Sequence, residues 1–398
     1  MRILQIATSF PIDETDPTAP FVRSIARALV TQGHELQIVV PYRHGMPATT
    51  SEPGITVHWV KYAPVGRLNV IGHGNSLKND MSLRRAAVIA IPFFVCGAIR
   101  RAMSIAHTWR PTVIHSQWLL PSGLIGALVA KVAGIPHIVS LLGSDVYVAR
   151  MRREFRAAAR WVCRNSAHVT ACSNYLAAQA IQLGANPGQV HFLPLGVDPS
   201  LFRARDAATE SVSAPIVLAV GRLVEKKGFE VLVNHADAFL AAHPEAELWI
   251  AGEGSNRHLL ERIIAAKPGE LGARIKLLGL ISYSRLPDLL RLATVFVLPS
   301  IHDSKGNQDG MPAVLLEAMS CGVAAVVTDI GGARMLIEDG KTGVVVPSGD
   351  GPRLGQAIAD LLSDPERRSA FGLAASSLVT SEYTWKAMAT QLDHVFTE

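Results

Sequence analysis

The 398-residue sequence is poor in cysteine and in aromatic side chains, which make up only 6% of it. No cysteine belongs to a C-x-x-C pair, so neither a zinc ribbon nor a disulfide framework is expected, and a reducing cytoplasm suits the chain. With 49% hydrophobic and 18% charged residues, the composition is that of a folded α/β protein. The four cysteines are Cys96, Cys163, Cys172 and Cys321.

Long hydrophobic runs are also scarce. The N-terminal "MRILQIATSF" is too brief for a signal peptide and is more typical of a buried first strand. The longest nearly uncharged apolar stretch covers 86–99 and contains Pro92. Because a membrane-spanning helix needs about 20 apolar residues, we expect no membrane span here.

Several catalytic and nucleotide-binding motifs are missing. The sequence has no D-x-D and no cluster of His, Cys and carboxylate residues at metal-ligand spacing, so we expect no metal and no cofactor. The lack of G-x-S-x-G disfavours a serine hydrolase. There is no Walker loop, and no G-x-G-x-x-G follows the first strand, which disfavours a dinucleotide dehydrogenase.

Charge is unevenly distributed between the two halves. Residues 1–198 contain 19 Lys and Arg against 9 Asp and Glu, and residues 199–398 contain 19 against 24. The basic half indicates an anionic partner, either a membrane surface or a phosphorylated acceptor. Nucleic acid is disfavoured because no zinc finger, helix-turn-helix or aromatic RNP pattern is present. The stretch 149–164 predicts a basic amphipathic helix, which fits a membrane surface as well as a solvated helix face.

Short apolar runs alternate with longer amphipathic segments, the pattern of parallel sheets with crossover helices. A Pro-, Ser- and charge-rich linker at 194–215 separates two such sets. We therefore expect two Rossmann-like α/β domains facing a cleft, over 1–196 and 197–383, with ligands at the carboxyl ends of the strands. The expected strands are 2–8, 35–41, 55–60, 111–116, 136–142, 167–173 and 189–195, then 216–221, 247–252, 274–279, 295–300, 323–328 and 342–347.

Two polar motifs follow strands of the second half. In "AVGRLVEKKGFEVLV", Arg222, Lys226 and Lys227 precede a helix start, which indicates either an anion site or an exposed basic loop. In "GNQDGMPAVLLEAMSCG", Pro312 suits the first helical position, so Asp309 lies in the loop and Glu317 inside the helix. Asp309 could simply cap that helix. A carboxylate among Leu315, Leu316, Ala318 and Met319 needs a partner, however, which favours a functional role for Glu317.

The first half offers weaker candidates. His115 lies at the end of the expected strand 111–116 and Asp145 follows the expected strand 136–142, so both are expected to face the interdomain cleft on the acceptor side. A single histidine at a strand end is more often a hydrogen-bonded structural group.

Together, these segments resemble the retaining glycosyltransferases of family 4, which have the two-domain GT-B fold. The resemblance covers most of the chain. It is carried by "FVRSIARALVTQGHEL", "LPLGVDPSLF", "GRLVEKKG", "DGMPAVLLEAMSCG" and "YTWKAMATQLDHVF", the last matching a family helix that crosses back onto the first domain, here about 384–398. The resemblance implies sugar transfer from a nucleotide donor with retention of anomeric configuration. Combined with the cysteine content and the basic half, it leads us to expect a cytoplasmic enzyme, peripheral to the membrane, that uses a UDP- or GDP-sugar and a glycan, polysaccharide or lipid-linked acceptor.

The resemblance also assigns roles by position. Arg222 and Lys227 are expected to hold the donor diphosphate and stabilise the leaving group, and Asp309 to contact the donor sugar. Glu317 is expected to bond the nucleotide ribose. The backbone of Gly310, Met311 and Pro312 would lie against sugar and phosphate, and the segment from Gly279 through Leu280 to Ile281 would lie beside the base.

Three positions depart from the family pattern. Asp309 stands where the family usually has Glu, Leu142 replaces the His of "HGSD", and Met335 replaces the Glu of "GG-x-P-E". Because the replaced His usually approaches the donor sugar, a nucleotide-sugar-binding subunit without catalysis is one alternative. A nucleotide-sugar epimerase of the same architecture is another.

Overall fold

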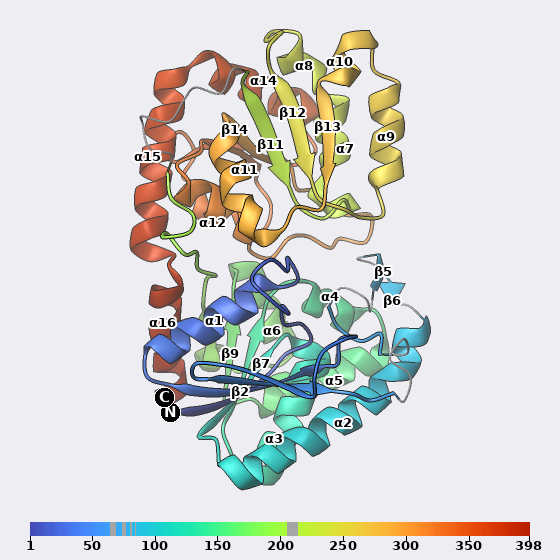
Figure 1. Cartoon of the computed structure of the whole chain (residues 1–398), viewed down its shortest axis with the longest axis vertical. Helices are drawn as coiled ribbons and strands as arrows, with labels where there is room; N and C mark the ends of the chain where they lie inside the picture. The colour runs from blue at the N-terminus through green and yellow to red at the C-terminus, as the bar shows by residue number, and fades with distance from the viewer. Residues whose placement is uncertain (64–68, 74–76, 80–81, 84, 205–213) are drawn as a thin grey trace. The chain divides into compact units, whose positions relative to one another are not determined.

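The structure is a computed structural model that describes residues 1–63, 69–73, 77–79, 82–83, 85–204 and 214–398. Residues 205–213 of the expected linker, 194–215, therefore lie outside the described residues. The chain folds into two compact units (Figure 1). Unit 1 comprises Met1–Leu195 and Trp385–Glu398, and unit 2 comprises Gly196–Thr384.

Unit 1 is built on an eight-stranded sheet with the order β10-β9-β8-β7-β1-β2-β4-β3, parallel except for β3. The seven strands expected in this half are confirmed, because buried parallel strands are nearly continuous apolar runs. The polar edge strand β3 lacks such a run and was not predicted. The strands are β1 Arg2–Ile6, β2 Glu35–Pro41, β3 Thr49–Glu52, β4 Ile55–Val60, β7 Val113–Gln117, β8 His137–Leu141, β9 His168–Ala171 and β10 Val190–Phe192, and a small antiparallel pair joins β5 Leu77–Asn79 to β6 Ser82–Leu83.

Helices α2 and α3 share one hydrophobic core with strands β1, β2 and β7. Helices α1 and α16 pack against each other, and Phe396 of α16 contacts His115 of β7 edge-to-face. Successive side chains of a strand point to opposite faces, so Ile114 enters the α2 core while His115 points toward α16. The helices are α1 Pro20–Thr31, α2 Arg85–Trp109, α3 Leu124–Ala133, α4 Ser144–Arg150, α5 Arg153–Asn165, α6 Asn174–Gln182 and α16 Trp385–Thr397.

Helix α2 is longer than the apolar stretch 86–99, from which we expected a segment too short to span a membrane. The apolar stretch continues into one helix of 25 residues, with Pro92 inside it, and is long and apolar enough to cross a membrane by length and composition alone. Phe94, Ala98 and Ala102 are buried in the core of unit 1, whereas Ile89 and Phe93 are exposed. One side of α2 is therefore a core face of this unit.

Unit 2 contains a six-stranded sheet, wholly parallel, with the order β13-β12-β11-β14-β15-β16. Its six strands were all expected from the sequence and are confirmed: β11 Ile216–Val220, β12 Glu247–Ala251, β13 Ile275–Gly279, β14 Val295–Leu298, β15 Ala325–Thr328 and β16 Val344–Val346. Helices α7, α8, α9 and α14 share a core with the sheet. The helices are α7 Phe229–Asn234, α8 Asp237–Leu240, α9 Arg257–Ala265, α10 Gly269–Ala273, α11 Leu286–Leu292, α12 Ala313–Ser320, α13 Ala333–Leu336, α14 Gly351–Ser363 and α15 Pro365–Glu382.

Candidate active site

The charged motifs of unit 2 lie at the point where its strand order reverses. From β11 the chain proceeds outward through β12 to β13, and it then returns to β14 on the other side of β11. The loops after β11 and β14 therefore leave the same sheet edge side by side. In parallel α/β sheets this edge is where ligands bind.

Hydrogen bonds hold these two loops together. The N–H of Ile301 donates to the carbonyl of Lys226 at 2.9 Å, and the N–H of Ser304 donates to Oε1 of Glu225 at 2.8 Å. Gly228 has a left-handed φ of 65°, and a Cβ there would lie 1.8 Å from the Pro299 carbonyl oxygen. Only glycine allows the two backbones to approach this closely.

Asp309 is the centre of a buried charged cluster. Its Oδ2 lies 2.8 Å from Nζ of Lys227 and accepts a hydrogen bond of 2.8 Å from the Ser300 hydroxyl. Its Oδ1 lies 3.7 Å from Nζ of Lys226. Asp309 is buried, and its carboxylate bonds neighbouring loops and not the amides of α12, so it is not a helix cap. The ammonium groups of two lysines thus lie beside one buried carboxylate.

Electrostatics keep Asp309 ionised despite its burial. Burial alone would raise its pKa, but Lys227, Lys226 and the Ser300 hydroxyl lower the pKa to about 2. A Cβ at Gly221 would lie 3.4 Å from Cε of Lys227, which places the lysine chain along the turn that carries Arg222. Arg222 itself is exposed.

The segment Gly310–Pro312 continues from this cluster into α12. The helix begins at Ala313, with Pro312 as its N-cap, which shifts the expected start by one residue. Gly332 packs against this segment: its N–H donates to the Gly310 carbonyl at 2.6 Å. A Cβ at Gly331, where φ is 60°, would lie 2.2 Å from the Asp309 carbonyl oxygen. The glycine pair thus fixes the backbone next to Asp309.

Glu317 is the fifth residue of α12 and is only 8% exposed. Burial raises its pKa to about 7, against the opposing effect of a hydrogen bond from the Tyr283 side chain. Tyr283 follows the segment that starts at Gly279, the end of β13. Tyr283 is therefore the hydrogen-bonding partner of Glu317. The sequence showed that this carboxylate needs a partner but did not identify it.

The expected base-side segment lies at the sheet edge beyond β12. The Gly279 carbonyl accepts a hydrogen bond of 2.7 Å from the N–H of Gly252, and Leu280 is 66% exposed. The Glu253 carbonyl in turn accepts from the N–H of Leu223 at 2.9 Å. Backbone bonds thus connect the β13 end to the loop that carries Arg222.

His115 does not present its side chain at a surface, contrary to expectation. It is fully buried in unit 1, where Nε2 lies 2.8 Å from the Ser140 hydroxyl and the ring contacts Phe396. Burial lowers its pKa to about 3, so the imidazole is neutral at physiological pH. Its Nδ1 has no hydrogen-bond partner among the described residues.

Asp145 is also internal to unit 1. Its carboxylate accepts from the N–H groups of Leu119 at 3.0 Å and Gly143 at 2.8 Å, and it is 3% exposed. Burial raises the pKa of this carboxyl even though backbone N–H groups lower it. Asp145 joins the turn at Leu119 to the turn at Gly143 through these hydrogen bonds. This structural role accounts for an aspartate after β8 and requires no ligand.

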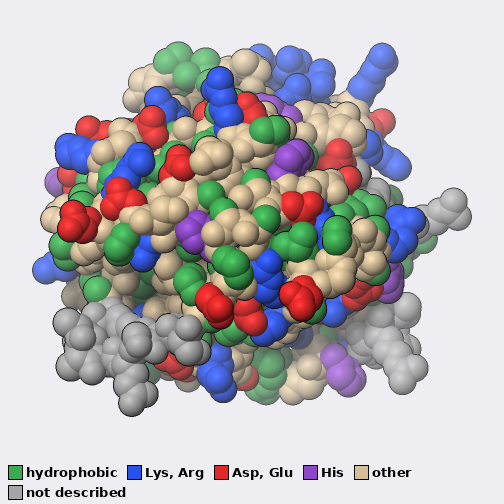
Figure 2. Space-filling view, turned by 90° about the horizontal axis from the view of Figure 1, so that it is seen from above, with side chains coloured by type: hydrophobic (Ala, Val, Ile, Leu, Met, Phe, Trp, Pro, Cys, Tyr) green, Lys and Arg blue, Asp and Glu red, His purple; other side chains and the backbone are tan. Residues whose placement is uncertain are grey.

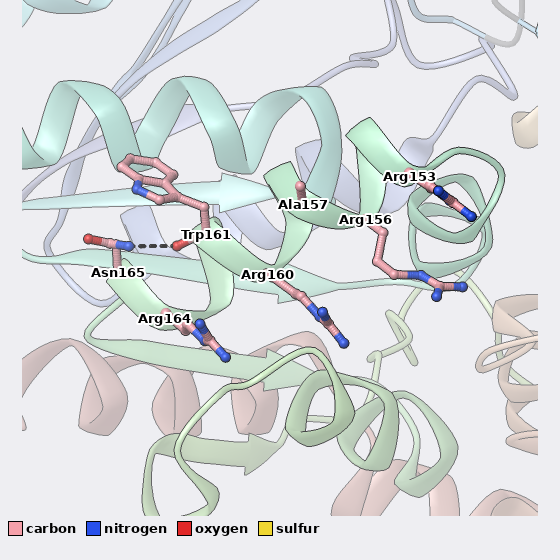
Figure 3. A pocket seen from close by; sticks show the side chains of 7 residues that line it. All are labelled: Arg153, Arg156, Ala157, Arg160, Trp161, Arg164 and Asn165. Atoms are coloured by element: carbon pink, nitrogen blue, oxygen red, sulfur yellow. Dashed lines mark hydrogen bonds between the residues drawn. The ribbon is translucent and has the colours of Figure 1, made fainter.

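The basic helix expected over 149–164 is interrupted. Arg152 is extended, so α4 ends at Arg150 and α5 begins at Arg153. An open hollow of about 500 Å³ runs along α5, lined by Arg153, Arg156, Ala157, Arg160, Trp161, Arg164 and Asn165. Figure 3 shows Trp161 directed away from Arg156 and Arg160. The arginines are exposed, and Lys131 lies 5.7 Å from the Trp161 ring.

Sequence reasoning missed Ser300 and Tyr283, the two neutral partners of the site carboxylates. The place of Ser300 at the end of the expected strand 295–300 was a usable signal. No local pattern identifies Tyr283, because its partner Glu317 lies 34 positions further along the chain.

Solved structures define the class to which this fold belongs. The sucrose-phosphate synthase of Thermosynechococcus elongatus aligns with a TM-score of 0.82 at 22% identity, covering 100% of this chain and 98% of that one. Anabaena HepE in complex with UDP-glucose aligns with a TM-score of 0.73 at 17% identity, covering 100% and 99%. The chain has the GT-B fold, with two Rossmann-like domains.

Sequence comparisons identify the family. Residues 18–196 match the glycosyl transferase 4-like domain, and residues 203–377 match glycosyl transferases group 1. An α-D-kanosaminyltransferase of Streptomyces kanamyceticus is 30% identical over 68% of this chain and 72% of its own length. A GDP-mannose-dependent phosphatidylinositol monomannoside mannosyltransferase of Corynebacterium glutamicum is 30% identical over 53% of this chain; the match spans 57% of that relative's length. This chain belongs to the family-4-type glycosyltransferases of group 1.

Proposed function

We propose that this chain is a retaining, metal-independent hexosyltransferase that moves a sugar from a UDP- or GDP-sugar to a glycan or lipid-linked acceptor. The observation that carries the proposal is the buried Asp309–Lys227–Lys226 cluster at the strand switch point of unit 2. It joins fixed positive charge to a carboxylate that stays ionised. A nucleotide diphosphate bonded to a polyhydroxylated sugar needs both kinds of group.

Lys227 and Arg222 would serve the diphosphate. When the bond between the sugar and the diphosphate breaks, the departing oxygen keeps the electron pair and gains negative charge. An ammonium held in place before the reaction stabilises that charge without reorganising. The backbone of Gly310, Met311 and Pro312 would lie against the donor sugar and phosphate.

Asp309 would accept hydrogen bonds from donor-sugar hydroxyls, since its low pKa keeps it an acceptor across the physiological range. Glu317 would bond the ribose, and the exposed segment at Gly279 and Leu280 would lie beside the base. Asp309 and Glu317 would then contact different parts of one extended donor, the sugar and the ribose.

The relatives support a nucleotide-sugar donor. One is named for GDP-mannose and a lipid-linked acceptor, and HepE was solved with UDP-glucose. We propose a donor from the same two classes for this chain.

The test combines binding and turnover. A thermal-shift screen of UDP- and GDP-sugars should show one preferred donor, because a ligand stabilises by RT ln(1 + [L]/Kd). The preferred donor is then incubated with glycan and lipid-linked acceptors, and the anomeric configuration of the product is read by NMR.

The outcomes separate the alternatives. A new glycoside with retained configuration supports the proposal, and an inverted product contradicts the retaining mechanism. Epimerised sugar from donor alone indicates an epimerase. Tight donor binding with no turnover on any acceptor indicates a binding subunit. No shift with any nucleotide sugar removes the assignment of the donor site.

We also propose that unit 1 contacts an anionic membrane surface through α5, which would place a cytoplasmic enzyme beside lipid-linked acceptors. Arg156, Arg160 and Arg164 repeat every four residues on an exposed helix face. On the face seen in Figure 2, by contrast, acidic and basic side chains are interleaved. Near an anionic surface each such arginine contributes about 1 kcal/mol.

Sedimentation with anionic and neutral vesicles tests this. We expect binding to the anionic vesicles alone, lost in Arg156→Glu/Arg160→Glu. The double variant Arg262→Glu/Arg353→Glu, with the same charge change on unit 2, is the control. Equal binding to both vesicle types, or equal loss in both double variants, removes the α5 assignment.

A further inference from the structure

Three potential metal ligands meet at one edge of the unit 1 sheet. His168 opens β9, His191 lies on the neighbouring strand β10, and Glu398 directly follows α16. Nδ1 of His168 is 2.9 Å from Nε2 of His191. Oε2 of Glu398 lies 3.9 Å from the first nitrogen and 3.6 Å from the second. The three atoms form a compact triangle with sides of 2.9, 3.6 and 3.9 Å.

The size of this triangle matches a first-row transition metal. A point equidistant from three atoms separated by 2.9, 3.6 and 3.9 Å lies about 2.0 Å from each of them. Zinc–nitrogen and zinc–carboxylate distances are about 2.0–2.2 Å. The ligand atoms therefore need little movement to coordinate one ion. Calcium and magnesium are disfavoured, because they prefer oxygen ligands.

The surroundings suit coordination as well. The side chains of His168 and His191 are 15% and 24% exposed, and that of Glu398 is 56% exposed. The imidazoles are thus held by the sheet while solvent can reach the ion.

A hydrogen-bonded histidine pair would explain only part of this arrangement. One N–H to N bond satisfies the two facing nitrogens, yet Glu398 also directs an oxygen at both of them. Two imidazoles and one carboxylate on a single point are a common ligand set for zinc with an open fourth position.

We propose that His168, His191 and Glu398 bind one Zn²⁺ ion, which fastens the end of α16 to the edge of the unit 1 sheet. Water completes the coordination. The site is distinct from the cluster around Asp309 in unit 2 and takes no part in donor chemistry. Its role is to stabilise unit 1, because an ion that binds only the folded state shifts the folding equilibrium.

The test uses the whole chain, stripped with chelator and titrated with ZnCl₂ by calorimetry. We expect one equivalent to bind, with affinity falling roughly tenfold or more in His191→Ala and in Glu398→Gln. His258→Ala is the matched control, because His258 also faces a glutamate, Glu261 at 3.1 Å, but stands 93% exposed outside the cluster. Unchanged stoichiometry and affinity in both cluster variants overturns the proposal.

Two further measurements protect against a variant that fails to fold. Co²⁺ added to the stripped wild-type chain should give the intense visible bands of a low-coordinate site, and His191→Ala should abolish them. One equivalent of Zn²⁺ should raise the melting temperature of the wild type, by roughly 4 °C. Glu398→Gln, at an exposed side chain, should melt normally without metal and lose that increase. An equal increase in this variant, or weak octahedral cobalt bands in the wild type, contradicts the site.

Discussion

Lys227 Nζ lies 2.8 Å from Oδ2 of Asp309, although the two residues follow different strands and stand 82 positions apart. Their side chains are 12% and 10% exposed, so the pair is largely shielded from water. The parallel pairing of β11 with β14 brings them together. The cation proposed for the diphosphate and the acid proposed for the sugar are thus one ion pair.

Removing the proposed phosphate contacts should slow transfer. We expect Lys227→Ala and Arg222→Ala each to reduce kcat about 100-fold, the usual effect of losing a preorganised charge contact. Steady-state kinetics with the preferred donor measure this. Lys341→Ala, which removes an exposed lysine of the same unit, should leave kcat unchanged. Near-normal rates in both site variants would contradict the diphosphate assignment.

The ion pair between Lys227 and Asp309 should also contribute to the free energy of unfolding. Lys227→Ala leaves the Asp309 carboxylate buried without its nearest cation, so we expect a loss of about 2 kcal/mol in the free energy of unfolding. Adding Asp309→Asn removes the unpaired charge. The double variant should therefore be more stable than Lys227→Ala alone, as measured by urea denaturation at pH 7. Strictly additive losses would show that the two residues do not interact.

Glu317 should make stability depend on pH. Its carboxyl ionises near pH 4.5 when unfolded, but its folded pKa is about 7, so the folded state holds an extra proton between these values. Stability therefore falls as pH rises from about 4.5 to about 7. Glu317→Gln should match the wild type near pH 4.5 and exceed it above pH 7, by at most about 3 kcal/mol. Urea denaturation at several pH values measures the difference, and a constant offset would contradict the raised pKa.

The same substitution tests the ribose contact. A carboxylate accepts hydroxyl hydrogen bonds better than a carboxylic acid, so the donor KM of the wild type should fall as pH rises through about 7. Glu317→Gln should have a higher donor KM without that pH dependence. A large drop in kcat with unchanged KM would instead assign Glu317 a catalytic role.

Gly331 should be far less tolerant of alanine than Gly349. Both have left-handed φ, at 60° and 76°, so each alanine costs about 1 kcal/mol in backbone strain. At Gly331 the new Cβ would also lie 2.2 Å from the Asp309 carbonyl oxygen, whereas at Gly349 nothing lies within 4 Å. We expect Gly331→Ala to lose clearly more stability by thermal melting and to raise the donor KM. Equal losses would show that the close approach is not required.

Much of the fold could be predicted because its signals are local. Thirteen apolar runs were expected as strands and all became strands, since buried parallel strands need little more than such a run between crossover helices. The polar strand β3 and the full length of α2 were not predicted. β3 pairs only at an edge, and α2 extends past the apolar stretch 86–99 through polar and charged residues to Trp109.

The parts of the site that are formed by residues close together in the sequence could be predicted. The cations of "GRLVEKKG" and the loop-to-helix junction at Pro312 can be inferred from the residues themselves. His115 and Asp145, expected to face the cleft, have side chains buried within unit 1, because a strand end can lie beneath helices or fold back onto its own turns. Their partners, Phe396 for His115 and Leu119 for Asp145, are not adjacent in the sequence.

By itself, the sequence determined the alternation of strands and helices, the family, and the charges available to a donor. It could do so because side-chain periodicity, glycine, proline and charge act over a few residues. Only the tertiary structure decided which polar groups meet: Asp309 with Lys227, Glu317 with Tyr283, and His168 with His191 and Glu398. These contacts depend on the order of the strands in each sheet, which no short stretch of sequence specifies.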